Sequence, residues 1–152
     1  MHLATCLGLL EDTEKQLTRA FEHVAEKHRD EPDIEQICQK FSAWSRNHHG
    51  QILGFVEKYS DEQEAEPDKL NRDLFARNRS GALALLRDLH DLWLLTQQVQ
   101  LCWTVIRQAA LGLRDEELKA CATSCAARTK RQTDWLLGRV KQAAPQTLLV
   151  AE

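Results

Sequence analysis

Apolar residues recur at steps of three and four along the first 28 residues, which predicts a long amphipathic helix. One face of this helix would carry Leu3, Leu7, Leu10, Glu14, Leu17, Phe21, Val24 and His28. Glu14 is the polar residue in the middle of this face. Burying a carboxylate among apolar side chains costs free energy unless the carboxylate meets a partner. We therefore expect a partner for Glu14 on a neighbouring helix.

Three further segments show the same helical spacing. Together with the first, they predict a single domain over residues 1–152 with helices at about 3–28, 34–59, 80–112 and 116–143. Residue types at the helix ends support these limits. Gly112 is expected to end the third helix and Asp115 to cap the fourth, which should stop before Pro145.

Two short connections and one long one join these helices, and the long one is an acidic linker at about 60–79. This combination predicts an all-α fold, an up-down four-helix bundle with one long crossover between the second and third helices. A short turn also predicts which residues of two antiparallel helices face each other. The turn near residues 30–31 places Glu14 at the level of His48, and the turn near 113–114 places Thr96 near Gln132.

Each apolar face is thus interrupted at mid-length, and the interruptions are expected to form one polar layer. The residues concerned are Glu14, His48, Thr96, Thr129 and Gln132. One interpretation is a hydrogen-bonded polar core that fixes the helix register. The other is a metal site, because di-iron bundles place one Glu from each of two helices and a Glu-x-x-His pair from each of the others at this level.

At this layer, and in its helix order, the chain over about residues 3–143 resembles the ferritin-like superfamily. The resemblance is greatest to small bacterial members that are uncharacterised or associated with stress. Glu14 matches the ligand of the first helix and His48 matches the His of the first Glu-x-x-His pair. The remaining ligand positions hold Ser45, Thr96, Thr129 and Gln132. The resemblance therefore implies a member that has lost most of its iron ligands.

Composition narrows the function classes. The net charge of −3 gives no reason to expect nucleic acid as a partner. No apolar run approaches the roughly 20 residues of a membrane span, and no signal peptide is apparent. The charge is uneven, however: residues 1–68 contain 7 Lys and Arg against 15 Asp and Glu, whereas residues 69–152 contain 13 against 8. Oppositely charged halves fit either packing within one bundle or a surface for self-association.

Five cysteines without a framework spacing predict free thiols in a reducing cytoplasm. Cys121 and Cys125 lie four residues apart, and Cys102 is expected near the level of Cys125. These thiols fit a soft-metal site, a redox pair, or simple packing as small apolar side chains. His23, His28 and His90 are expected near helix edges, in structural or exposed positions.

We therefore expect a non-enzymatic helical bundle that associates with itself, as a dimer, or with another protein. A role in stress is what the resemblance implies. The alternative is iron binding or oxidation at Glu14 and His48, with Thr129, Gln132 or water as replacement ligands. No cofactor is expected apart from iron under that alternative. A third hypothesis is a small-molecule carrier with a cavity beside Trp44 and Trp103.

Overall fold

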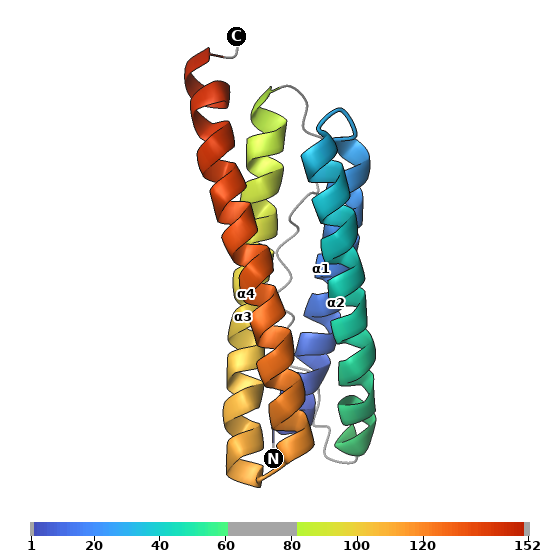
Figure 1. Cartoon of the computed structure of the whole chain (residues 1–152). Helices are drawn as coiled ribbons and strands as arrows, with labels where there is room; N and C mark the ends of the chain where they lie inside the picture. Colours follow the sequence, from blue (N-terminus) through green and yellow to red (C-terminus); the bar gives the residue numbers. More distant parts are fainter. Residues whose placement is uncertain (1, 61–81, 151–152) are drawn as a thin grey trace.

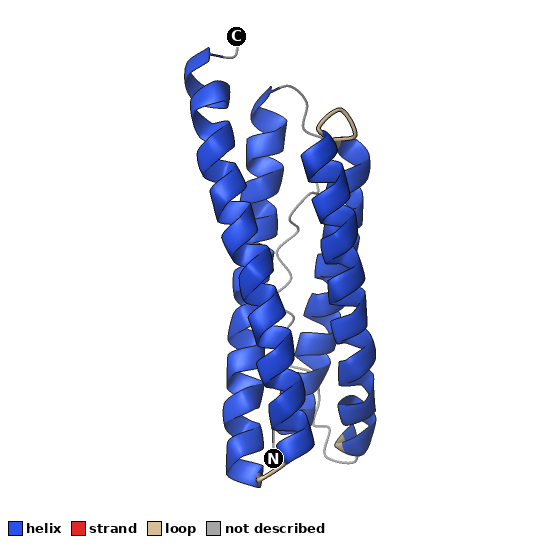
Figure 2. Cartoon of the chain, viewed as in Figure 1, coloured by secondary structure: helices blue, strands red, loops and turns tan. Residues whose placement is uncertain are grey.

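The computed structural model describes residues 2–60 and 82–150, which form a bundle of four long helices with no strand in these two ranges (Figures 1 and 2). The helices are α1 (Leu3–Lys27), α2 (Pro32–Lys58), α3 (Ala82–Leu113) and α4 (Glu116–Pro145). The predicted all-α four-helix bundle is confirmed. The expected helix limits agree to within two residues, except that the expected start of the third helix near residue 80 lies outside the described residues. The expected linker at about 60–79 lies, apart from Ser60, outside the described residues.

The apolar faces predicted from the sequence form the core. In α1 the fully buried apolar side chains are Leu7, Leu10, Leu17, Phe21 and Val24. Each meets the apolar face of a neighbouring helix, because α1 packs along α2 and also on α3. The α3 helix packs along α4 in the same way, whereas the backbones of α2 and α4 approach each other less closely. The core therefore runs the length of the bundle between two helical hairpins.

Figure 1 shows that α1 and α4 run in one direction and that α2 and α3 run in the other. Side-chain contacts agree with this arrangement. Lys58, at the end of α2, lies 2.9 Å from Asp115 beside the α3–α4 turn, and Lys27, at the end of α1, lies 2.9 Å from Asp88 near the start of α3. The two helix ends joined by residues 61–81 therefore lie at opposite ends of the bundle. This is the helix order expected for one long crossover between α2 and α3.

Near the two short turns, two helix ends differ from the expectation and one agrees with it. The α2 helix begins at Pro32, two residues early, because proline has a fixed φ that suits the first helical position and its missing N–H is not needed there. Gly112 does not end α3, which continues to Leu113, and Arg114 takes the left-handed conformation with φ 57°. Asp115 caps α4 as predicted, because its carboxylate accepts a hydrogen bond from the Leu118 N–H at 3.0 Å.

The prediction that α4 stops before Pro145 is wrong. The helix includes Pro145 and passes into a π-helical segment, η2 (Gln146–Val150). Proline removes one backbone donor and its ring crowds the preceding turn. A wider helical turn directly after the proline is one way to continue the chain without that hydrogen bond.

Candidate functional site

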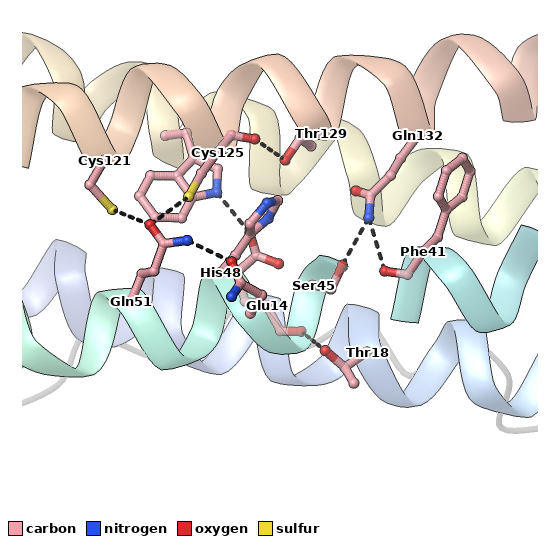
Figure 3. Close-up of polar contacts among 12 residues, drawn as sticks. Glu14, Thr18, Phe41, Ser45, His48, Gln51, Cys121, Cys125, Thr129 and Gln132 are labelled. Atoms are coloured by element: carbon pink, nitrogen blue, oxygen red, sulfur yellow. Dashed lines mark hydrogen bonds and ion pairs between the residues drawn. The ribbon is translucent and has the colours of Figure 1, made fainter. Parts of the chain in front are cut away.

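A buried acid and imidazole lie at the middle of the bundle (Figure 3). His48 Nδ1 of α2 lies 3.2 Å from Glu14 Oε1 of α1, and both side chains are almost completely buried. This is the contact predicted from the antiparallel pairing of the first two helices. The short turn between α1 and α2 fixes the register that brings the two residues to one level.

Trp103 of α3 is a third member of this cluster, and sequence reasoning did not pair it with Glu14. Its indole N–H donates to Glu14 Oε1 at 2.7 Å, and its ring meets the His48 ring edge-on at 6.2 Å between centroids. Glu14 Oε1 thus has two donors, from α2 and α3. A carboxylate with charge-assisted hydrogen bonds of this kind is tolerated in a dry interior far better than a lone one.

The other predicted members of the layer are buried but do not bond to Glu14. The Thr96 and Thr129 hydroxyls donate to carbonyls of their own helices, those of Trp93 and Cys125. Threonine hydroxyls satisfy themselves in this way when no partner helix offers an acceptor. The expectation that these two residues complete a network around Glu14 is therefore wrong.

Gln132 of α4 forms a separate contact with α2, one turn away along the bundle. Its amide donates to the Phe41 carbonyl at 3.2 Å and to the Ser45 hydroxyl at 3.0 Å (Figure 3). Ser45 occupies the position where the ferritin-like pattern has Glu. The polar residues at mid-bundle thus form two clusters: Glu14 with His48 and Trp103, and Gln132 with Ser45.

Three buried polar atoms in these clusters have no hydrogen-bond partner among the described residues. They are Glu14 Oε2, His48 Nε2 and Gln132 Oε1. Glu14 and His48 bring only two metal-binding side chains together. Within residues 2–60 and 82–150, no group of three or more His, Cys, Asp or Glu side chains is placed to hold one metal ion. Two side chains orient an ion but leave most of its coordination to other donors.

All five cysteines, each in the described part of the chain, are free thiols. Burial raises the pKa of Cys38 to about 12 and that of Cys102 to about 11, so both are protonated at neutral pH. The thiolate is the nucleophilic and metal-binding form of cysteine, so either group would have to lose a proton before it could react or bind. Cys121 differs, because a hydrogen bond with Cys125 lowers its pKa.

A third polar cluster, which sequence reasoning missed, lies at the end of the bundle near the α1–α2 turn. His28 Nε2 lies 2.8 Å from Asp88 Oδ2 and Lys27 Nζ lies 2.9 Å from the same oxygen. Burial opposes the charge of Asp88, but the hydrogen bonds from His28 and Lys27 outweigh it and lower the pKa of the carboxyl. His28 and Asp88 come from helices whose relative register the sequence does not fix, so no spacing rule would have paired them.

A cavity of about 580 Å³ opens at the same end of the bundle, between the α1–α2 turn and the end of α4. Its lining residues are His28, Asp30, Glu31, Leu85, Arg139, Gln142, Ala143, Gln146, Thr147 and Val150. Neither Trp44 nor Trp103 is among them, so this cavity is not the one expected beside those two residues.

The fold and the buried layer define an all-α four-helix bundle with an acid–imidazole–indole cluster at its centre. No known protein family, curated protein or solved structure matches the chain. Within the described ranges, no helix has both the length and the apolar character needed to cross a membrane.

Proposed function

We propose that this chain is a non-enzymatic helical-bundle protein that associates with a second copy of itself through the outer face of α3. The main observation behind this proposal is a row of uncharged side chains on that face. We call this row the α3 stripe, and it consists of Leu94, Gln98, Leu101 and Val105. These residues follow one another at steps of four and three, so they share one side of the helix. Leu101 is 65% exposed and Val105 is 47% exposed.

The sequence around the α3 stripe suits a surface that is covered by a partner when the protein functions. Residues 92–106 contain no charged side chain over about four helical turns. A helix that is hydrophobic around its whole circumference is usually covered on all sides, and the absence of charge brings this segment close to that case. The α1 and α4 helices pack on α3 but leave Leu101 and Val105 exposed, so a further partner would complete its burial.

A second copy of the chain fits the α3 stripe better than a charged partner. Two-fold symmetry places the same patch on both sides of an interface, and two uncharged patches meet without unpaired charge. The glutamine amide of Gln98 supplies a donor and an acceptor that can pair across the axis. Most symmetric oligomers of soluble proteins are dimers of this type.

The interior supports a non-enzymatic role. Glu14 and Trp103 are fully buried and His48 is 1% exposed. A substrate would need an opening to reach them, and the cavity at the end of the bundle is lined by neither Glu14 nor His48. The five free thiols support a reducing compartment, the cytoplasm, as the place of action.

Analytical ultracentrifugation tests the proposal. The wild-type chain is expected to sediment as a dimer, and Leu101→Glu is expected to sediment as a monomer with an unchanged circular dichroism spectrum. Leu53→Glu is the matched control, because Leu53 is 44% exposed but lies on α2, away from the stripe. A monomeric wild type, or equal dissociation by both variants, would contradict the proposal.

The second candidate function is metal binding at the centre of a ferritin-like bundle. The specific observation in its favour is that Glu14 Oε2 and His48 Nε2 are buried without partners among the described residues. The helix order, with one long crossover between α2 and α3, also supports a relationship to ferritin-like bundles. Glu14 Oε2 and His48 Nε2 would coordinate the iron, whether it stays bound or is oxidised and released. Water or Gln132 Oε1 would supply further ligands.

Anaerobic loading with Fe(II), desalting and metal counting by mass spectrometry tests this candidate. Iron retained in stoichiometric amount by the wild type and lost in Glu14→Gln would support it. Retention near zero, or retention that Glu14→Gln does not change, would remove it. Leu101→Glu serves as a control here, since the outer face of α3 lies away from Glu14.

A further inference from the structure

Cys121 and Cys125 of α4 face one side-chain amide of α2 (Figure 3). The Cys121 Sγ lies 3.5 Å from Gln51 Oε1, and the Cys125 Sγ lies 3.9 Å from the same oxygen. The two cysteines are four residues apart, so their side chains project from one face of the helix. Gln51 completes a small group with two sulfurs and one oxygen at the α2–α4 interface.

The orientation of Gln51 is set by a neighbour on its own helix. Its Nε2 donates to Asn47 Oδ1 at 2.6 Å, which directs Oε1 toward the two thiols. A carbonyl oxygen in this position accepts hydrogen bonds from S–H groups and can also approach a cation. Cys121 is half-buried and Cys125 is buried, so an ion can enter past Cys121 from solvent.

The two sulfurs differ in acidity. The hydrogen bond with Cys125 lowers the pKa of Cys121, and the same hydrogen bond, together with burial, raises the pKa of Cys125. Of the two thiols, Cys121 is therefore the one that loses its proton more readily. The thiolate is the form of cysteine that binds metal.

The spacing of the pair favours a bridging ion over a disulfide. Side chains four residues apart on a helix have Cβ atoms about 5–6 Å apart. A disulfide needs a Cβ–Cβ distance of about 3.5–4.5 Å, so direct closure would distort the helix. A metal with two sulfur bonds of about 2.3 Å each spans the larger separation without moving the backbone.

We propose that Cys121 and Cys125, with Gln51 opposite, form a two-coordinate binding site for a soft cation of the Cu(I) type. Thiolate ligands select soft ions, and Cu(I) accepts a low coordination number. Zinc prefers four ligands, and among the described residues no third His, Cys, Asp or Glu completes the group. On binding, both sulfurs become thiolates, and each thiol that was still protonated releases its proton to solvent.

Anaerobic titration of the full-length chain with Cu(I), in competition with the chromogenic chelator bicinchoninate, tests the site. The wild type is expected to take copper stoichiometrically from the chelator, with a new thiolate-to-copper absorption in the near ultraviolet. Cys121→Ser is expected to lose both signals. Because Cys121 is partly exposed, this substitution should leave the fold intact, and circular dichroism checks that it does.

Cys6→Ser is the matched control, since Cys6 is also half-buried but lies on α1. Copper that is lost in Cys6→Ser and retained in Cys121→Ser would overturn the proposal, as would no stoichiometric uptake by the wild type. X-ray absorption of the copper-loaded chain gives a second measurement. Two sulfur neighbours support the site, and a copper shell of nitrogen or oxygen alone overturns it.

This site is independent of both candidate functions. Glu14→Gln is expected to keep copper uptake even if it abolishes iron retention. Leu101→Glu is expected to keep copper uptake even if it dissociates the dimer. Failure of the copper titration therefore leaves the proposals on self-association and on iron untouched.

Discussion

The two carboxylate oxygens of the buried residue Glu14 differ sharply in their hydrogen bonding. Its Oε1 accepts from the Trp103 indole and contacts His48, whereas Oε2 has no partner among the described residues. A buried carboxylate in this state depends strongly on the donors that it has. Losing one of them leaves the charge under-solvated, which costs more than the loss of an ordinary hydrogen bond.

Trp103→Phe is therefore expected to lower the free energy of unfolding by about 1.5–3 kcal/mol, because it removes a donor to a charged group. Urea denaturation followed by circular dichroism measures the change. Trp93→Phe is the matched control, since the Trp93 Nε1 is buried without a partner among the described residues. Its substitution removes a similar ring volume but no hydrogen bond. Equal destabilisation by both variants would show that the indole donor contributes little.

At the scale of the helix, Asp115 connects three segments. It caps α4 through the Leu118 N–H and accepts from the Tyr59 hydroxyl at 2.7 Å and from Lys58 Nζ at 2.9 Å. The backbone hydrogen bond from Leu118, followed by those from Tyr59 and Lys58, lowers the pKa of Asp115 to about 2. One carboxylate thus starts α4 and holds the end of α2 beside the α3–α4 turn.

Asp115→Ala is expected to cost about 1 kcal/mol from the lost cap alone. Asp115→Asn keeps an oxygen at the cap and should cost less. Because the folded pKa is depressed, the contribution of the charge is present above the unfolded value of 3.8 and is lost as the pH falls toward 2. Urea titrations across that pH range should show a steeper loss of stability for the wild type than for Asp115→Asn. Parallel profiles would contradict this account.

Which contacts between helices can be predicted from the sequence depends on the length of the connection between those helices. Glu14 and His48 were paired correctly because a short turn fixes the register of α1 against α2. Trp103 was not assigned to Glu14, because the long crossover leaves the register of α3 against α1 unspecified. The same reason hid the Gln132–Ser45 contact between α4 and α2. Thr96 and Thr129 show a different limit, since a polar residue on an inner face can bond to its own backbone.

The approximate extent of each helix could be predicted from the spacing of apolar residues. The exact residue at which a helix ends depended on local backbone and side-chain chemistry. Asp115 was predicted as a cap from its residue type and its place before an acidic first turn. Gly112 was a reasonable stop signal, but the left-handed position is taken by Arg114, two residues later. Pro145 was expected to exclude the helix and instead lies within it. A residue type signals that a helix end is near more reliably than it signals where the last turn lies.

At the scale of the whole molecule, the uneven charge and the α3 stripe make opposite predictions about salt. An interface between uncharged stripes should have a dissociation constant that changes little between low and high ionic strength. An interface between the acidic first half and the basic second half should weaken markedly as salt screens it. Sedimentation at about 0.05 and 0.5 M salt separates the two, because the Debye length falls severalfold over this range. Strong salt dependence would place the interface elsewhere than on α3.

The position of Glu14 has a consequence for the alignment of the whole bundle. If α1 slid along its axis by one turn, about 5.4 Å, the apolar Leu10 or the neutral Thr18 would arrive opposite the imidazole and the indole. The carboxylate would then lose the two donors that meet it now, the His48 imidazole and the Trp103 indole. The other inner positions from Leu7 to Val24 would exchange one apolar residue for another, and His28 at the end of α1 would leave Asp88. Glu14 therefore helps to fix the axial position of α1 relative to α2 and α3 at the same time. A face made of leucine alone would specify that position less strongly.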